Sequence, residues 1–380
     1  MSTSKLNKIH REALARLENL IDPEHVAQCE RVQHAAWSGE ELPYLPTIVG
    51  TSLSDWPAYS FTECWDDVEK NFMTGLAGIY AGAVLRDDRL FSLRPEYGVV
   101  NIPELFGIPS VVSDEGRSMT EGLHDTALVR ELVRNVRPDF RCSHARKVLD
   151  FYQYAEEALR PYEKLSSSVH FVLPDTQGPF DLACLIWGTD IFVAMHDEPE
   201  LVSSLIRLMT DTYIEYNKTV KTVIGEAPNS AYHIAGLKLV QGGVRICDDS
   251  ATLVSADFYR DLIMRENERA FAPFGGGWLH YCGNGNHLQS IMQQMRGVHA
   301  MHLGNPDMHD LLEIGKGLIK NKVTLFWSGS LDKIDAWRET FGLRHLIFLA
   351  ENRYAGRNLN DSRDKLQRLR ACEKIERAEY

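Results

Sequence analysis

The segment from residue 275 to residue 303 reads GGGWLHYCGNGNHLQSIMQQMRGVHAMHL and shows the pattern that decides the fold. Two short apolar runs, at 278–282 and 298–303, are separated by a polar connection. Each run has the length of a buried strand. The same order of strand, loop and helix recurs along the chain, and this order is typical of an α/β protein with a parallel sheet.

Eight strands are predicted in this way, and amphipathic helices are predicted between them. The strands are expected at 45–51, 83–87, 170–175, 238–247, 278–282, 298–303, 323–327 and 345–350. Asp197 and Ser255 are predicted helix N-caps. Eight such units favour a (β/α)8 TIM barrel. The alternative is an open doubly wound sheet, but no GxGxxG follows the first strand and no GxxxxGK[ST] is present.

The barrel is expected to form one structural domain with two additions. Residues 1–80 are predicted to be an N-terminal helical extension that leads into the barrel, which then occupies 81–380. The stretch 98–150 is long for one connection and is predicted to be an insertion with its own helices. A chain of 380 residues that is 44% hydrophobic can bury a full core.

Composition and charge exclude several classes of function. The chain has 41 Lys and Arg against 53 Asp and Glu, a net charge of −12, so nucleic-acid binding is disfavoured. Asp190 interrupts the longest apolar run, at 182–195, and we therefore expect no membrane span. The seven cysteines are odd in number and scattered, which favours free thiols in a reducing, cytoplasmic setting.

The sharpest candidate site is His280 with Cys282. Residues two apart in a strand point to the same side, so the imidazole and the thiol converge where the strand ends. Barrel enzymes place their chemistry at such ends, and a catalytic zinc takes three side chains of these kinds. Glu351 is the first candidate for the third ligand. The alternative is a barrel-lining histidine beside a buried cysteine.

Weaker candidates for the third ligand are Asn305, His302 and Asp249. For His302, a place in the core as a hydrogen-bonded histidine is the favoured interpretation. Asn305 begins an Asn-Pro-Asp turn that starts a helix, and it could also face the substrate.

Carboxylates at two further predicted strand ends could orient a substrate or move a proton. Asp248 and Asp249 are adjacent and point to opposite faces, so one could face the mouth while the other caps the next helix. Asp88 follows another predicted strand, and Arg89 beside it makes a surface ion pair the alternative. Polar side chains that could bind substrate are Gln177, Ser250 and Asn305.

Several segments together resemble the uroporphyrinogen decarboxylase superfamily, over most of residues 80–360. They are TQGPF at 176–180, DDSA at 248–251, SADFY at 255–259, GGGWLHYCG at 275–283 and GNPD at 304–307. The resemblance implies a (β/α)8 barrel with a deep pocket at its C-terminal mouth. One branch of the superfamily decarboxylates uroporphyrinogen without a cofactor. The other holds zinc and moves methyl groups between a corrinoid protein and a small molecule.

The decarboxylase branch fits this sequence badly. That branch opens with an arginine-rich loop for the substrate's carboxylates, and the matching region 41–46 contains no arginine. It places a tyrosine where this chain has Leu185 and a histidine where this chain has Glu351. A metal-independent decarboxylase of another small carboxylated substrate remains the alternative, and a non-catalytic binder of a corrinoid or tetrapyrrole ranks last.

The methyltransferase branch fits better, with one departure. His280 and Cys282 match its zinc motif, and Glu351 falls near the position of the family's second cysteine. The resemblance implies zinc, a corrinoid (cobalamin) carried by a partner protein, and a small thiol, ether or amine substrate. A carboxylate ligand would make the metal more Lewis-acidic, which suits an oxygen or nitrogen substrate at least as well as a thiol. A homodimer is compatible with this assignment.

Overall fold

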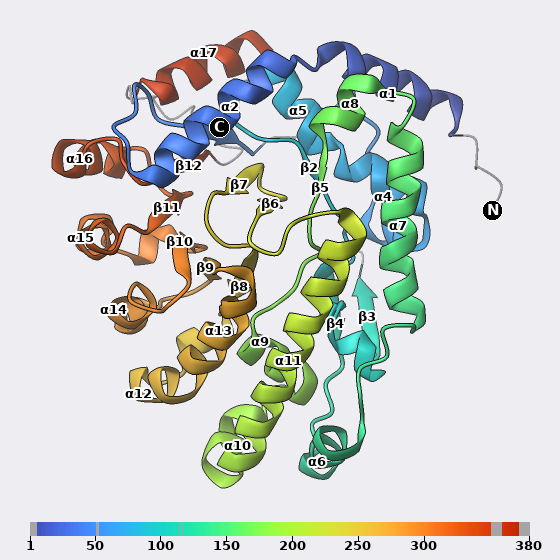
Figure 1. Ribbon diagram of the computed structural model, residues 1–380, viewed down its shortest axis with the longest axis vertical. Coiled ribbons are helices and arrows are strands. Elements are labelled where there is room, and N and C mark those ends of the chain that lie inside the picture. Colours follow the sequence, from blue (N-terminus) through green and yellow to red (C-terminus); the bar gives the residue numbers. More distant parts are fainter. Residues whose placement is uncertain (1–5, 51–52, 114, 116, 351–358, 372–380) are drawn as a thin grey trace.

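The computed structural model describes residues 6–50, 53–113, 115, 117–350 and 359–371. A six-stranded parallel sheet lies at its centre, in the order β1-β12-β11-β10-β9-β8. A second parallel sheet pairs β2 with β5 (Figure 1). The strands of the main sheet, in its spatial order, are β1 (Thr47–Val49), β12 (Leu346–Ala350), β11 (Thr324–Trp327), β10 (Val298–Leu303), β9 (Gly277–Tyr281) and β8 (Val244–Cys247). Those of the second sheet are β2 (Ser92–Leu93) and β5 (His170–Phe171).

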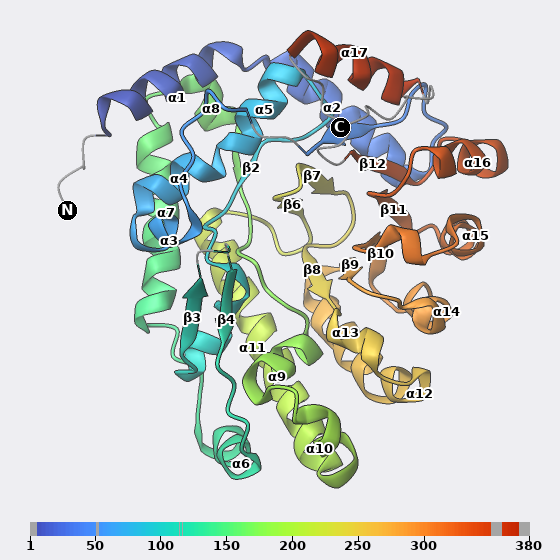
Figure 2. The same ribbon diagram turned by 180° about the vertical axis from the view of Figure 1, so that it is seen from behind.

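Helices surround these strands, as both ribbon views show (Figure 1, Figure 2). The first half of the chain supplies α1 (Lys8–Leu20), α2 (Pro23–Ser38), α3 (Phe61–Asp66), α4 (Val68–Gly75), α5 (Ala77–Leu85), α6 (Thr126–Asn135), α7 (Ser143–Leu159), α8 (Glu163–Ser168) and α9 (Pro179–Trp187). The second half supplies α10 (Ile191–Asp197), α11 (Pro199–Ile224), α12 (Ala256–Phe258), α13 (Met264–Phe271), α14 (Gln289–Met292), α15 (Leu311–Asn321), α16 (Asp332–Phe341) and α17 (Leu359–Arg370).

The prediction of an α/β fold with a parallel sheet is confirmed, and the arrangement is consistent with a TIM-barrel-like fold. Seven of the predicted strands overlap strands of the structure. The prediction at 83–87 is wrong, because those residues belong to α5 and the turn after it. Every residue of α5 from Ile79 to Leu85 is buried. In a short apolar run that is buried on all sides, the spacing of the apolar residues does not distinguish a helix from a strand. The next strand along the chain is β2, which begins at Ser92.

The predicted strand at 238–247 is two strands. It divides into β7 (Leu237–Leu239) and β8, because Gly242 takes a positive φ of 83°. A Cβ there would lie 2.2 Å from the carbonyl carbon of Gly276, so only glycine fits. β7 pairs instead with β6 (Ala231–His233), and this hairpin lies inside the ring of helices (Figure 1).

The N-terminal region and the insertion each contribute strands as well as helices. Residues 1–80 supply helices and the predicted strand at 45–51, which is β1 and pairs with β12 at the edge of the main sheet. The insertion contains α6 and a hairpin of β3 (Ser110–Ser113) with β4 (Arg117–Thr120). One hydrophobic core runs from Leu14 in α1 to Leu369 in α17. Both regions are therefore packed into the same body as the sheet.

Helix starts follow the sequence signals closely but not everywhere. Ser255 caps α12 as predicted, because its hydroxyl accepts the N–H of Phe258. Asp197 is the last residue of α10, and Glu198 stands at the start of α11 without a side-chain cap.

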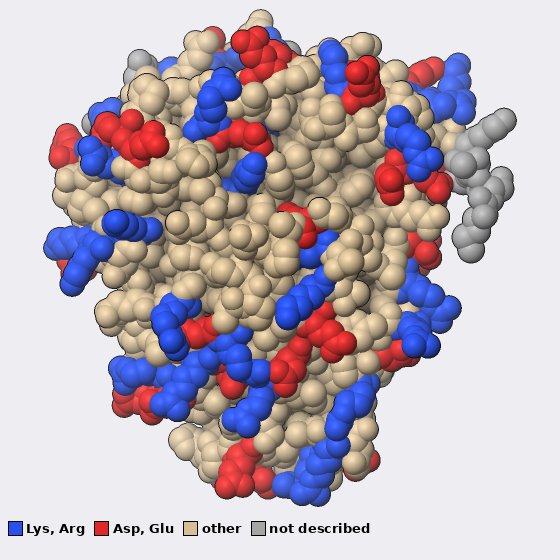
Figure 3. Space-filling view, in the orientation of Figure 1, with Lys and Arg blue, Asp and Glu red and all other residues tan. Residues whose placement is uncertain are grey.

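Among the described residues, no helix combines the length and the apolar character needed to cross a membrane. Basic and acidic side chains lie beside one another on the face drawn in Figure 3.

Candidate functional site

Three neighbouring strands bring side chains of metal-binding types to one level of the sheet. In the parallel register, Cys247 of β8 lies opposite His280 of β9, and His280 lies opposite His302 of β10. Opposite residues on adjacent parallel strands point to the same face, so these three side chains share one side of the sheet. All three stand at the carboxyl ends of their strands, where the sequence analysis expected the site.

The predicted pair of His280 and Cys282 is brought together, and Asp249 joins it. The Nε2 atom of His280 lies 3.5 Å from Sγ of Cys282 and 3.7 Å from Oδ1 of Asp249. The backbone N–H of Cys282 donates to the same Asp249 oxygen at 2.6 Å. Tetrahedral zinc with bonds of about 2.0–2.3 Å keeps its ligand atoms roughly 3.3–3.8 Å apart. The two distances from His280 therefore fit a zinc site.

Cys247 lies close to the same group. One ligand atom each from Cys247, Asp249 and His280 falls within a span of 4.8 Å. Cys247 is buried, whereas Cys282 is exposed, and burial raises the pKa of both thiols. Cys247 was not among the predicted ligands. It lies two residues before Asp249, and side chains at this spacing in a strand point to the same side, so the spacing was the signal that could have identified it. Glu351, the other predicted ligand, lies outside the described residues.

His302 holds the ring of His280 in place. Their Nδ1 atoms are 2.9 Å apart, and the two rings stack with centroids 4.8 Å apart. Burial lowers the pKa of both rings, to about 4 for His302, so both are neutral near pH 7. With the shared proton on His280 Nδ1, its Nε2 lone pair faces Cys282 and Asp249. His302 then carries its own proton on Nε2, a buried atom that has no hydrogen-bond partner among the described residues.

The two carboxylates that follow β8 point in different directions, as expected for neighbours in a strand. Asp248 turns away from the metal-binding group, and its Oδ2 accepts hydrogen bonds of 2.7 Å from Tyr259 and Asn267. Burial raises the pKa of Asp248 to about 7. Ser250 stays near Asp249, because the backbone N–H groups of both residues donate to the carboxyl of Asp181 in α9, each at 2.8 Å.

Asp88 lies apart from this group. It accepts the backbone N–H of Thr47, the first residue of β1, and pairs with Arg370 at 2.7 Å. Thr47 marks the amino end of β1, whereas His280 and Asp249 stand at the carboxyl ends of strands parallel to it. Arg89 pairs instead with Asp87, at 2.7 Å, and this pair is largely buried rather than on the surface. Asp88 thus connects α17 to the amino end of β1, at the end of the sheet away from His280 and Asp249.

A cavity of about 500 Å³ opens beside Asp249. Two of the predicted substrate-binding residues, Gln177 and Ser250, line it, and Asp181 does so as well. The third, Asn305, accepts the N–H of Gly283 at 2.6 Å and so shapes the loop after β9. The remaining walls come from the insertion, from α9 and α10 with the turn between them, and from the turn after β8. They are Val99, Met119, Thr120, Glu121, Gly122, His124, Cys184, Leu185, Gly188, Thr189, Phe192 and Leu253.

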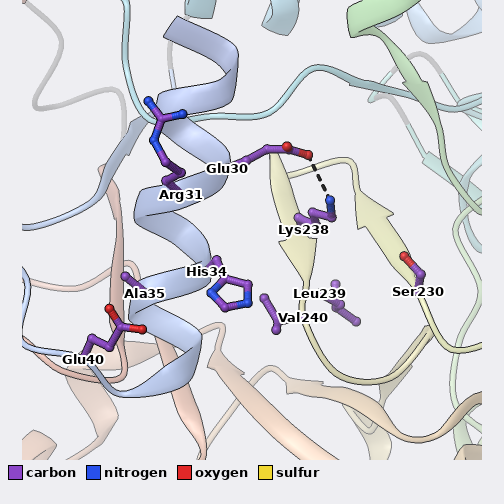
Figure 4. Close-up of a pocket in the computed structure, with 9 residues that line it drawn as sticks. All are labelled: Glu30, Arg31, His34, Ala35, Glu40, Ser230, Lys238, Leu239 and Val240. Carbon is purple, nitrogen blue, oxygen red and sulfur yellow. Dashed lines mark hydrogen bonds and ion pairs between the residues drawn. The ribbon is translucent and has the colours of Figure 1, made fainter. Parts of the chain in front are cut away.

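A second cavity, of about 480 Å³, lies between α2 and β7 (Figure 4). Its charged walls include Glu30 and Lys238, which form an ion pair of 2.9 Å. Figure 4 shows His34 between this pair and Glu40. None of the predicted site residues lines this cavity.

One solved structure with a similar fold is a methyltransferase from Methanosarcina mazei. The TM-score is 0.56 and the sequence identity 16%, over 89% of this chain and 96% of that chain. No family model matches the sequence, and no curated protein matches it. At this identity the likeness concerns the fold, which the two chains share over nearly their whole lengths.

Proposed function

We propose that the protein is a zinc-dependent methyltransferase of a corrinoid pathway, which moves a methyl group between a corrinoid protein and a small substrate. One observation carries the proposal: Nε2 of His280 lies at zinc-ligand spacing from both Sγ of Cys282 and Oδ1 of Asp249, beside a cavity of about 500 Å³. The fold shared with a protein named a methyltransferase agrees with it.

The proposal includes a closed (β/α)8 barrel. The strands β2 and β5 would fill the gap between β1 and β8, which are the two edges of the main sheet. Backbone hydrogen bonds support closure on both sides. The N–H of Asp88, before β2, donates to Thr47 of β1 at 2.9 Å, and the N–H of Gly178, after β5, donates to Cys247 of β8 at 2.9 Å.

His280, Cys282 and Asp249 would hold the metal, with Cys247 directly beneath them. Glu351 stays a proposed further ligand at the end of the last strand. When bound, zinc supplies Lewis acidity that lowers the pKa of a thiol or polarises the heteroatom that carries the methyl group. A site of one imidazole, one thiolate and one carboxylate is within the usual zinc repertoire.

The chain's own residues supply the remainder of the site. Gln177 and Ser250 would bind the substrate from the cavity wall, and Asp181 holds the loop that carries Asp249 and Ser250. The corrinoid protein would dock over the carboxyl ends of the strands, since its methyl group must reach the substrate. Asp248 and Asp88 take no part in the reaction in this proposal, because their partners lie elsewhere.

The test combines metal analysis with methyl-transfer assays on cobalamin. We expect about one zinc per chain and cobalamin-dependent methyl transfer, both lost in Cys282→Ser. Cys142→Ser is the matched control, since Cys142 only caps α7 and serine caps a helix well. Full methyl transfer by the metal-free protein or by Cys282→Ser would contradict the zinc role. Decarboxylation of a small carboxylated substrate by these proteins, without methyl transfer, would favour the metal-independent decarboxylase.

A further inference from the structure

We propose that the substrate held in the cavity beside Asp249 is a methylated ammonium cation, an inference that rests on the proposed methyl-transfer function. Methylated amines are thereby selected over anionic thiols and neutral ethers. Three features of the cavity support this assignment: the charges of its wall, one free amide and its apolar surface.

The charged side chains around the cavity are acidic. Glu121, Asp181 and Asp249 line it, and no lysine or arginine does so among the described residues. Among the described residues of the wall, His124 is the only titratable base, and it lies beside Asp190 at the exposed rim. The side chains of the wall away from the metal ligands therefore offer a small anion no fixed positive charge, whereas a cation would meet the carboxylates of Glu121 and Asp181.

Asp181 gives this charge a fixed position. Its side chain belongs to a residue that is only 4% exposed, and both carboxyl oxygens accept backbone N–H groups at 2.8 Å. A cation in the adjacent cavity could lie close to this carboxyl, whereas a neutral ether would bring it no counter-charge.

Gln177 presents a free amide to the same space. The residue is 8% exposed, lines the cavity and forms no hydrogen bond with the described part of the chain. An amide at a cavity wall that no side chain or backbone group engages is available to a ligand. Its carbonyl oxygen can accept an ammonium N–H, or face the positive surface of a methylated ammonium group.

An aromatic ring and a thioether complete the cavity. Phe192 and Met119 line it, and Phe192 is held by Phe180 at a centroid distance of 6.3 Å. Aromatic faces attract quaternary and methylated ammonium groups. The volume of about 500 Å³ accommodates such a ligand together with a short substituent.

The test measures binding of three probes of equal shape and different charge. They are choline, its uncharged isostere 3,3-dimethyl-1-butanol and the anion 3,3-dimethylbutanoate, titrated calorimetrically into the full-length zinc-loaded protein. We expect choline to bind at least about tenfold more tightly than either isostere, as cation–π and ion-pair contacts predict. Equal binding of the neutral isostere, tighter binding of the anion, or no binding of choline would overturn the proposal.

Three substitutions locate the effect. Asp181→Asn and Glu121→Gln should each weaken choline binding and leave the neutral isostere unchanged. Phe192→Leu should do the same without any change in charge, which keeps the proposal testable if Asp181→Asn fails to fold. The control is Glu12→Gln on α1, where the side chain is 67% exposed. If all three variants bind choline as the wild type does, the cavity is not the cation site.

A methyl-transfer assay separates this inference from the proposed function. Each protein is given cob(I)alamin with trimethylamine, anisole or S-methylthioglycolate as methyl donor. Methylation of cobalamin from the amine supports both statements. Methylation from only the ether or the anionic thioether retains the methyltransferase and overturns the amine assignment. No methylation from any donor, with selective choline binding intact, contradicts the methyltransferase alone.

Discussion

The Nδ1 atoms of His280 and His302 lie 2.9 Å apart, so one ring donates the proton and the other accepts it. If His302 is the acceptor, it fixes the His280 tautomer whose Nε2 can bind a metal. Residues that orient metal-binding histidines in this way typically contribute about 10–100-fold to metal affinity. We therefore expect His302→Phe to lower zinc affinity by about that factor, measured by competition with a chromophoric chelator.

Two companion variants control this experiment. His302→Gln restores an acceptor and should recover part of the affinity. His299→Ala changes a histidine on the same strand that instead bonds the carbonyl of Gly275 at 3.0 Å, and it should bind zinc normally. Unchanged affinity in His302→Phe would remove His302 from the site.

Gly304 provides the space that the thiol of Cys282 occupies. A Cβ at this position would lie 2.6 Å from Sγ of Cys282 and 3.1 Å from Cε1 of His280. Gly304→Ala should therefore displace the thiol and lower zinc binding, measured as metal content after dialysis, while the circular dichroism spectrum stays that of the wild type. In Gly78→Ala the new Cβ meets only Arg89 at 3.5 Å, and this variant should retain its zinc.

The pair of Asp88 and Arg370 should stabilise the fold without serving the metal site. Asp88 is buried and pairs with Arg370 at 2.7 Å, so Asp88→Asn leaves a guanidinium without its counter-charge. We expect the free energy of unfolding to fall by about 3–5 kcal/mol in urea titrations, with zinc content unchanged. Asp22→Asn removes a half-exposed pair with Arg86 and should leave the free energy of unfolding close to that of the wild type. Loss of zinc from folded Asp88→Asn would return Asp88 to the site.

His144 should make stability depend on pH. Burial lowers the pKa of this histidine from 6.5 to about 4, and its Nε2 lies 3.0 Å from Oδ1 of Asn101. The unfolded chain therefore binds a proton below about pH 6.5 that the folded chain refuses until about pH 4. This contribution to stability is complete above pH 6.5 and is lost as the pH falls toward 4.

We expect the loss over that range to reach about 3 kcal/mol, since each pKa unit corresponds to about 1.4 kcal/mol. His144→Gln should remove this part of the pH dependence in urea titrations between pH 7 and pH 4. His34→Gln, on the exposed side of α2, should keep the wild-type slope. Equal slopes in the wild type and His144→Gln would show that another group titrates in this window.

Local sequence signals identified most of the sheet and the centre of the site. The strand β10 has the predicted bounds, because a six-residue apolar run between polar segments has few other solutions. The helix α5 was mistaken for a strand, since burial on every side erases the helical period. Period two within β9 was sufficient to pair His280 with Cys282, a relationship between neighbours along one strand.

Contacts between distant segments could not be predicted in this way. Asp249 joins His280 only because β8 and β9 pair in one register, and a slip of one residue would turn Asp249 to the other face. Asp181 belongs to the cavity because α9 packs against the turn after β8.

The residue types and their spacing along single strands thus determined the fold class and the two central candidate ligands. Strand register, helix packing and the burial of each carboxyl decided which acids lie at the candidate metal site and which serve the fold. These depend on energies summed over the whole core, and no short stretch of sequence carries them.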